Sequence, residues 1–199
     1  MVSDWGLVAA PTEEPLTLDE AKQHCAISQD DDNALLVAYL QAAREAAEQA
    51  LNRSLLTQTR RLRLSDFVDV IGLPMASPLQ SVSSIAYYDE DGALQTLSTA
   101  AYVVDTTTEP GRVSLAPNQS WPAVQCGRDL PITVTYVAGW TSAEQVPELV
   151  KQGMRFFLAS LEMDRLGGTA EAVAARTAAM HTWQMAGPVP WLDLGLCHA

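Results

Sequence analysis

The segment Pro78-Leu-Gln-Ser-Val-Ser-Ser-Ile-Ala-Tyr-Tyr-Asp-Glu-Asp-Gly92 has the pattern of a β-strand that ends in an acidic turn. Its second half, Val82 to Tyr88, is rich in residues that favour strands, and Gly92 can supply the positive φ of a tight turn. Similar segments surround it between about Gln58 and Trp140. The middle of the chain is therefore predicted to be a β-rich block.

Six further runs in this block have strand character, as Arg61-Leu-Arg-Leu64 shows by alternating polar and apolar residues. Short strands separated by turn signals favour a small antiparallel sandwich or an open barrel. The expected strands are Arg61–Leu64, Phe67–Leu73, Val82–Tyr88, Leu94–Leu97, Tyr102–Val104, Val113–Leu115 and Ile132–Val137.

Helical patterns precede the β block. Residues 1–15 are expected to form an extended arm, and Thr17-Leu-Asp-Glu20 then fits a capping box that opens a helix near 17–25. A longer helix is expected near 31–52, because apolar residues recur there at spacings of four and three. Its seam consists of Leu36, Leu40, Ala43, Ala47 and Ala50, and the alanines allow a second helix to approach closely. Arg44 and Glu48, four apart, are expected to pair on its outer side.

A third helix is expected near 147–165. Pro147 suits its first position, and Gly167-Gly168 suits its end. Its apolar face makes it the natural partner of the alanine seam. Thr169 to Met180 is alanine-rich and compatible with helix, whereas His181 to Ala199 combines tryptophans with Gly and Pro.

The last segment is too apolar for a free tail and too irregular for a core helix. Such segments dock, either on their own domain or on a partner, and tryptophan is a favoured interface anchor. The predicted partner-binding residues are Trp183, Met185, Pro188, Pro190, Trp191 and Leu192.

Bulk composition limits the possible functions. The chain has 199 residues, 48% of them hydrophobic, which suits one domain with a real core. A net charge of −12 disfavours binding of nucleic acid by a basic surface. There is no apolar run of membrane-spanning length and no signal peptide at the start, so we expect no membrane association and a cytoplasmic location. Cys25, Cys126 and Cys197 are odd in number and far apart, which argues against a disulfide framework.

Motifs that carry chemistry are missing from the sequence. We find no glycine-rich phosphate loop, no nucleophile elbow and no zinc-protease motif. A calcium loop starting at Asp30 would need Gly and Glu where Leu35 and Gln41 stand. Arg60, Arg61 and Arg63 are expected to form ion pairs rather than to bind phosphate. We therefore predict no enzyme activity, no cofactor and no catalytic or metal-binding residues.

The order of the motifs resembles the head–tail connector (adaptor) proteins of long-tailed phages and of phage-derived gene transfer agents. The resemblance spans roughly Leu16 to Arg165, and the ordered series rather than any one motif is specific. It is carried by Leu16–Lys22, Asp30–Leu36, Ala42–Ala46, Leu55–Thr59, Leu73-Pro74, Pro78–Val82, Tyr88–Gly92, Tyr102, Val104-Asp105, Pro110–Arg112, Val134–Gly139 and Val146–Glu148.

This resemblance implies an α+β fold: a helical ring-forming core, an inserted antiparallel β sandwich or open barrel, and an extended C-terminal tail. One connector domain would span 1–165, with helical parts 16–56 and 146–165 and a β-rich insert 57–140. Residues 166–199 would form the docking tail.

The resemblance also implies an assembly. Its subunits would self-associate into a ring, commonly dodecameric, beneath the portal protein. The ring would contact a stopper or tail-terminator protein, and double-stranded DNA would pass through its channel without sequence-specific binding. The protein would thus reside at the head–tail junction of the particle, after assembly in the host cytoplasm.

Two other classes of function stay open at this point. One is a carbohydrate- or protein-binding β module that presents aromatic side chains, and the other is a small hydrolase with a scattered site. Oligomeric state separates them from a connector, which must form rings. The candidate aromatic residues of the binding module are Tyr87, Tyr88, Tyr102, Trp121 and Trp140.

Overall fold

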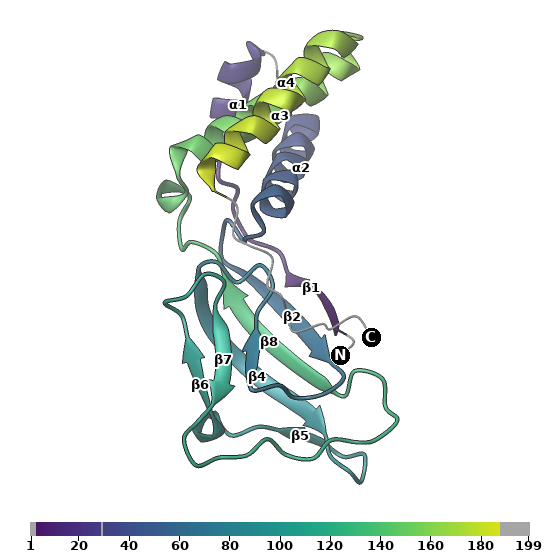
Figure 1. The fold of residues 1–199 in the computed structure, drawn as a ribbon. Coiled ribbons are helices and arrows are strands. Elements are labelled where there is room, and N and C mark those ends of the chain that lie inside the picture. The colour runs from purple at the N-terminus through teal and green to yellow at the C-terminus, as the bar shows by residue number, and fades with distance from the viewer. Residues whose placement is uncertain (1–2, 29, 188–199) are drawn as a thin grey trace. The chain divides into compact units, whose positions relative to one another are not determined.

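The computed structural model describes residues 3–28 and 30–187, which divide into two compact units. The β unit comprises residues 3–11 and 57–139. The helical unit comprises the described residues from 12 to 56 and from 140 to 187. Figure 1 shows the β-strands contributed by the middle of the chain and the helices contributed by the segments on either side of it.

The β unit consists of two antiparallel sheets (Figure 1). Each of the expected strands is present, with small differences in bounds, and the strand at residues 3–9 adds an eighth. The larger sheet has the order β1 (Ser3–Ala9), β2 (Gln58–Leu64), β8 (Ile132–Ala138), β4 (Leu79–Tyr88) and β5 (Leu94–Thr96). The smaller has the order β3 (Val70–Gly72), β7 (Arg112–Leu115) and β6 (Tyr102–Asp105).

Both sheets contribute to one core. Alternate residues of β8 are fully buried, as the pleat of a half-covered sheet requires. The buried Tyr136 hydroxyl donates a 2.6 Å hydrogen bond to the carbonyl oxygen of Pro74. The described strands form two antiparallel sheets and no closed barrel. Core residues include Leu62, Leu64, Ile71, Leu73, Ile85, Val113, Ile132 and Val134.

The N-terminal arm is extended, as expected, and it is also a paired strand. β1 lies at the edge of the larger sheet, where it pairs with β2 in a register that runs from Ser3 opposite Leu64 to Ala9 opposite Thr59. The sequence signal for this strand is weak because β1 has no clean alternation and most of its side chains are exposed.

The three arginines of β2 do not share a face. Arg60 is buried on the core side, whereas Arg61 and Arg63 point to the opposite side, because successive strand residues alternate. Arg63 lies 4.0 Å from the carboxylate of Asp4 on β1, an ion pair of the kind expected for this strand.

The helical unit begins with the predicted capping box. The Thr17 hydroxyl accepts a 3.2 Å hydrogen bond from the Glu20 amide, and the Thr17 amide donates a 2.8 Å hydrogen bond to the Glu20 carboxylate. These contacts satisfy amides at the start of α1 (Leu18–Cys25). Ala26 ends the helix in the left-handed region, with φ of 55°.

The alanine seam is confirmed in α2 (Asn33–Leu51). Leu36, Leu40, Ala43 and Ala47 are buried, and α2 packs against α3 (Glu148–Arg165) as expected. The small alanine side chains permit this approach. The shared core also contains Leu16, Leu51, Leu55, Leu56, Val146, Val150, Met154 and Leu158.

The helix that the alanine-rich segment from Thr169 to Met180 allows is present, whereas the extended tail expected from residue 166 is wrong for residues 169–186. This segment forms α4 (Thr169–Ala186), which packs along α3 (Figure 1). The alanine-rich sequence favours helix, and it places Ala172, Ala179 and Trp183 on one buried face at helical spacing. His181 to Ala186, expected to be irregular, is the last part of this helix.

Candidate functional site

The predicted partner-binding residues fall into separate environments. Trp183 and Met185 lie in the last turns of α4, where Trp183 is 1% exposed and Met185 is 66% exposed. Pro188, Pro190, Trp191 and Leu192 lie outside the described residues. Trp183 is therefore part of the helical core, and Met185 is the described member of the set that is available to a partner.

Trp183 is held by a close contact between α3 and α4. Its indole Nε1 donates a 3.2 Å hydrogen bond to the carbonyl oxygen of Val150, and its ring lies 5.9 Å from that of Phe157. A Cβ atom added to Gly153 would lie 2.3 Å from Nε1. The absence of a side chain at Gly153 is thus what admits the indole. The sequence signal for this contact was the glycine inside an otherwise apolar helix pattern.

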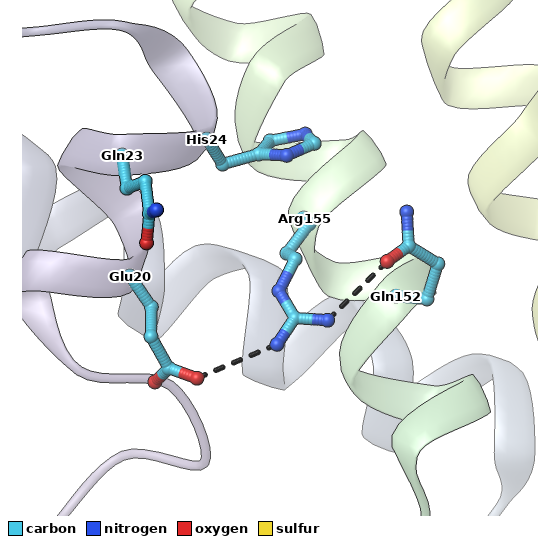
Figure 2. A pocket seen from close by; sticks show the side chains of 5 residues that line it. All are labelled: Glu20, Gln23, His24, Gln152 and Arg155. Carbon is cyan, nitrogen blue, oxygen red and sulfur yellow. Dashed lines mark hydrogen bonds and ion pairs between the residues drawn. The ribbon is translucent and has the colours of Figure 1, made fainter.

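A polar groove of about 450 Å³ lies between α1 and α3 of the helical unit. Figure 2 shows Glu20, Gln23 and His24 on one wall and Gln152 and Arg155 on the other. The Arg155 guanidinium lies 3.4 Å from the Glu20 carboxylate and 3.2 Å from the Gln152 side-chain oxygen, and it also pairs with Glu148.

The charged side chains of the groove are paired, because the Arg155 guanidinium contacts the Glu20 carboxylate. A hydrogen bond from the Thr17 amide, aided by Arg155, holds the pKa of Glu20 below its ordinary value. Partial burial lowers the pKa of His24, and the nearby Arg155 charge acts in the same direction. Glu20 is thus ionised and His24 neutral at neutral pH. The five residues that line the groove are polar or charged, and none of them is a Ser, Thr, Cys or Lys nucleophile.

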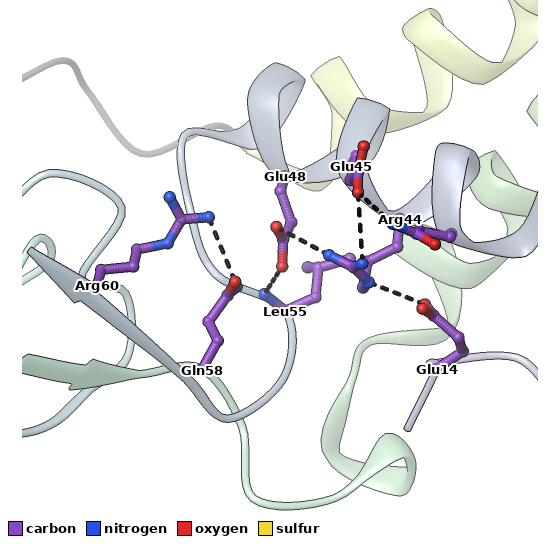
Figure 3. Close-up of polar contacts among 8 residues, drawn as sticks. Glu14, Arg44, Glu45, Glu48, Leu55, Gln58 and Arg60 are labelled. Carbon is purple, nitrogen blue, oxygen red and sulfur yellow. Dashed lines mark hydrogen bonds and ion pairs between the residues drawn. The ribbon is translucent and has the colours of Figure 1, made fainter. Parts of the chain in front are cut away.

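The expected ion pair between Arg44 and Glu48 is present, but it belongs to a buried network. Arg44 and Glu48 were expected on the outer side of α2, but they are only 2% and 3% exposed. Figure 3 shows the Arg44 guanidinium between Glu14, at 2.9 Å, and Glu48, at 3.4 Å. Glu45 lies 3.7 Å from the same group.

This network joins three segments of the helical unit. Glu48 also accepts a 2.9 Å hydrogen bond from the Leu55 amide, which ties the residues after α2 to the helix. Burial raises the pKa of Glu14, and the Arg44 charge opposes part of that rise. Because Glu14 lies 30 positions before Arg44, helical spacing alone cannot reveal the contact.

The candidate aromatic residues do not form a single platform. Trp121 stacks on Phe67 with ring centroids 4.6 Å apart, and Tyr102 is buried in the β core. Trp140 packs with the helical core and lies under the Arg53 guanidinium. Tyr87 contacts the same Phe67 ring edge-on at 6.1 Å, and Tyr88 lies under the Arg128 guanidinium. The five residues are thus divided among separate local contacts.

Within the described residues, no group of three or more His, Cys, Asp or Glu side chains is placed to hold a metal ion. None of the helices in the same part of the chain combines the length and apolarity needed to cross a bilayer. The described chain consists of a helical unit and a β unit, and α2 and α4 of the helical unit carry exposed apolar residues such as Val37 and Val173.

Comparison with known protein families relates part of the chain to one of them. Residues 15–107 match the model of the phage gp6-like head–tail connector proteins. The family is structural and not enzymatic. No curated protein sequence gives a significant match.

Solved structures extend the likeness over nearly the whole chain. A chain of the virion of a native gene transfer agent (GTA) particle superposes with a TM-score of 0.73 and 21% identity, covering 95% of this chain and 97% of that one. A chain from the neck of an empty GTA particle computed with C6 symmetry gives 0.71 and 20%, covering 96% and 98%. A chain from the neck of a native GTA particle computed with C12 symmetry gives 0.68 and 21%, covering 96% and 98%. At these identities the likeness establishes the shared fold.

Proposed function

We propose that the protein is the head–tail connector of a phage or gene transfer agent particle, forming a dodecameric ring between the portal protein and a stopper or tail-terminator protein. The observation that carries the proposal is the family match over residues 15–107, which coincides with a fold shared along the chain with GTA neck proteins. The symmetry of those necks supports self-association, and C12 symmetry supports twelve copies.

The ring would surround the channel through which double-stranded DNA passes. The net charge of −12 supports this role, because acidic walls repel phosphates and limit sticking during passage. Basic residues lining the channel in an assembled ring would contradict the electrostatic part of the proposal.

Docking on the portal is assigned to the C-terminal segment that starts with Met185. Met185 is exposed at the end of α4, and the predicted anchors Pro188, Pro190, Trp191 and Leu192 follow it. Trp183 would support the segment from within the helical core rather than contact the partner.

The test is co-expression of the full chain with its portal protein, followed by electron microscopy and affinity co-purification. We expect rings bound to the portal. A chain that stays monomeric and never binds the portal would refute the proposal.

The truncation that tests the docking segment should remove residues 188–199 and keep α4, because loss of Trp183 would damage the core. Failure of this truncation to bind, with unchanged helical content, is the expected result. Normal portal attachment by the truncation would refute the docking role and leave the connector function standing.

A further inference from the structure

We propose that the outer face of α4 is the contact surface for a second copy of this chain, and that it docks on the outer face of the first half of α2 in the neighbouring copy. We define the outer face of α4 as Val173, Ala174, Thr177, Met180, His181 and Gln184. The outer face of α2 consists of Ala34, Val37, Ala38 and Gln41. The inference rests on the proposed ring and identifies the surfaces that would build it.

The outer face of α4 is apolar where a solvent-facing helix is normally charged. Val173 is 60% exposed and Met180 is 46% exposed, and both lie on a line of residues spaced by four and three. The opposite side of the helix already packs on α3 through Ala172, Ala179 and Trp183. α4 is thus apolar both on the side that packs on α3 and on its outer face. Within the described residues, the outer face remains exposed.

The distribution of charge favours a second copy of this chain as the partner that binds the outer face of α4. Copies of a chain with a net charge of −12 repel one another wherever carboxylates would meet. The charged residues of α4 are Glu171 and Arg176, and Arg176 is turned toward α3, where it pairs with Asp164. The outer face itself carries no Asp, Glu, Lys or Arg, and its one histidine is the exposed His181. This face therefore lets an acidic neighbour approach at little electrostatic cost.

The same criterion selects the receiving surface. α1 exposes Asp19, Gln23 and His24, and α3 has no exposed residue between Val150 and Glu162. The first half of α2 is the other exposed helical surface of this unit that is mainly apolar, with Val37 51% exposed. Carboxylates flank it at Asp31, before the helix, and at Glu45, which accepts a 2.9 Å hydrogen bond from Gln41.

Two different faces on one subunit suit a ring. A contact between unlike faces is heterologous, so each copy can bind one neighbour through α4 and another through α2, and the series closes if the rotation permits. A contact of α4 with α4 would instead stop at a dimer.

Cross-linking tests the pairing directly. In a background with the three native cysteines changed to Ser, one variant carries Val37→Cys with a size tag and the other carries Met180→Cys. The two are mixed at ring-forming concentration, treated with a short bis-maleimide and analysed by mass spectrometry. Each variant has a single thiol, so every adduct joins two copies.

We expect the adduct between positions 37 and 180 to exceed, by at least about tenfold, the adduct formed with the control variant Leu94→Cys. Leu94 is 62% exposed on β5, in the β unit. A yield no higher than the control, or adducts mainly between two copies of position 180, would overturn the inference.

Charge variants give a second reading. Met180→Glu should abolish rings while leaving the helical content unchanged, and Val37→Lys in the same chain should restore them. The matched control Leu94→Glu should leave rings intact. Rings that persist in Met180→Glu would refute the contact but not the connector function, whereas a wild-type chain that never forms rings, even with its portal, would refute the function itself.

Discussion

Gly153→Ala is predicted to destabilise the helical unit, although alanine is normally the better helix former. In an open helix interior this change is worth about 0.8 to 1 kcal/mol in favour of alanine. Here the new Cβ would lie 2.3 Å from Nε1 and 2.6 Å from Cδ1 of Trp183, far inside contact distance. The indole must move, and it is buried against α3 and bonded to Val150.

The magnitude follows from three contributions. Overpacking a core costs about 1 to 3 kcal/mol. A buried indole N–H that loses its acceptor costs about 1 to 3 kcal/mol more. After subtraction of the helix-propensity gain of about 1 kcal/mol, the free energy of unfolding should fall by about 1 to 5 kcal/mol.

The assay is urea unfolding followed by circular dichroism at the helical band, which reports the unit that contains the α-helices. Gly6→Ala is the matched control, because a Cβ there meets nothing within 4 Å. In a Trp183→Leu background, Gly153→Ala should lose most of its cost, since the clashing ring is gone. A Gly153→Ala protein as stable as wild type, or an unchanged cost in the Trp183→Leu background, would refute the reasoning.

Three further predictions concern the helical unit. Arg44→Met should lower the free energy of unfolding by about 3 to 5 kcal/mol, because it leaves the buried Glu48 carboxylate without its cation; a loss below about 1 kcal/mol in urea unfolding would contradict a buried network. Thr17→Ala should cost about 1 kcal/mol by removing the cap of α1, and an unchanged unfolding midpoint would show that the cap adds nothing. Burial raises the pKa of Cys25 to about 11, so at pH 9 its thiolate is scarce, and its alkylation rate should keep rising through pH 11. Peptide mass spectrometry should find Cys25 alkylated more slowly than the exposed Cys126 at pH 9, and equal rates would contradict the shift.

Local pattern was sufficient for most of the secondary structure. The capping box of Thr17 and Glu20, the alanine seam of α2 and the strand at Ile132–Ala138 were predicted from spacing alone. Each of these features depends either on contacts between residues close in the sequence or on burial of one face of the element. Such features produce a regular spacing of residue types that can be recognised in the sequence. β1 and the end of α4 were not predicted, because an exposed edge strand shows no clean alternation and residues 181–186 lead into a segment that contains Gly and Pro.

By itself, the sequence determined the order of the elements, the acidic character of the chain and the motif series that resembles a connector. Only the tertiary structure decided that Trp183 is a core residue set on Gly153, that Arg44 is buried between carboxylates from distant segments, and which helix faces stay uncovered. The physical reason is the sequence separation over which the interactions act. Helix and strand signals arise between near neighbours, whereas burial depends on residues such as Glu14 and Gly153 that the folded chain brings into contact across long sequence separations.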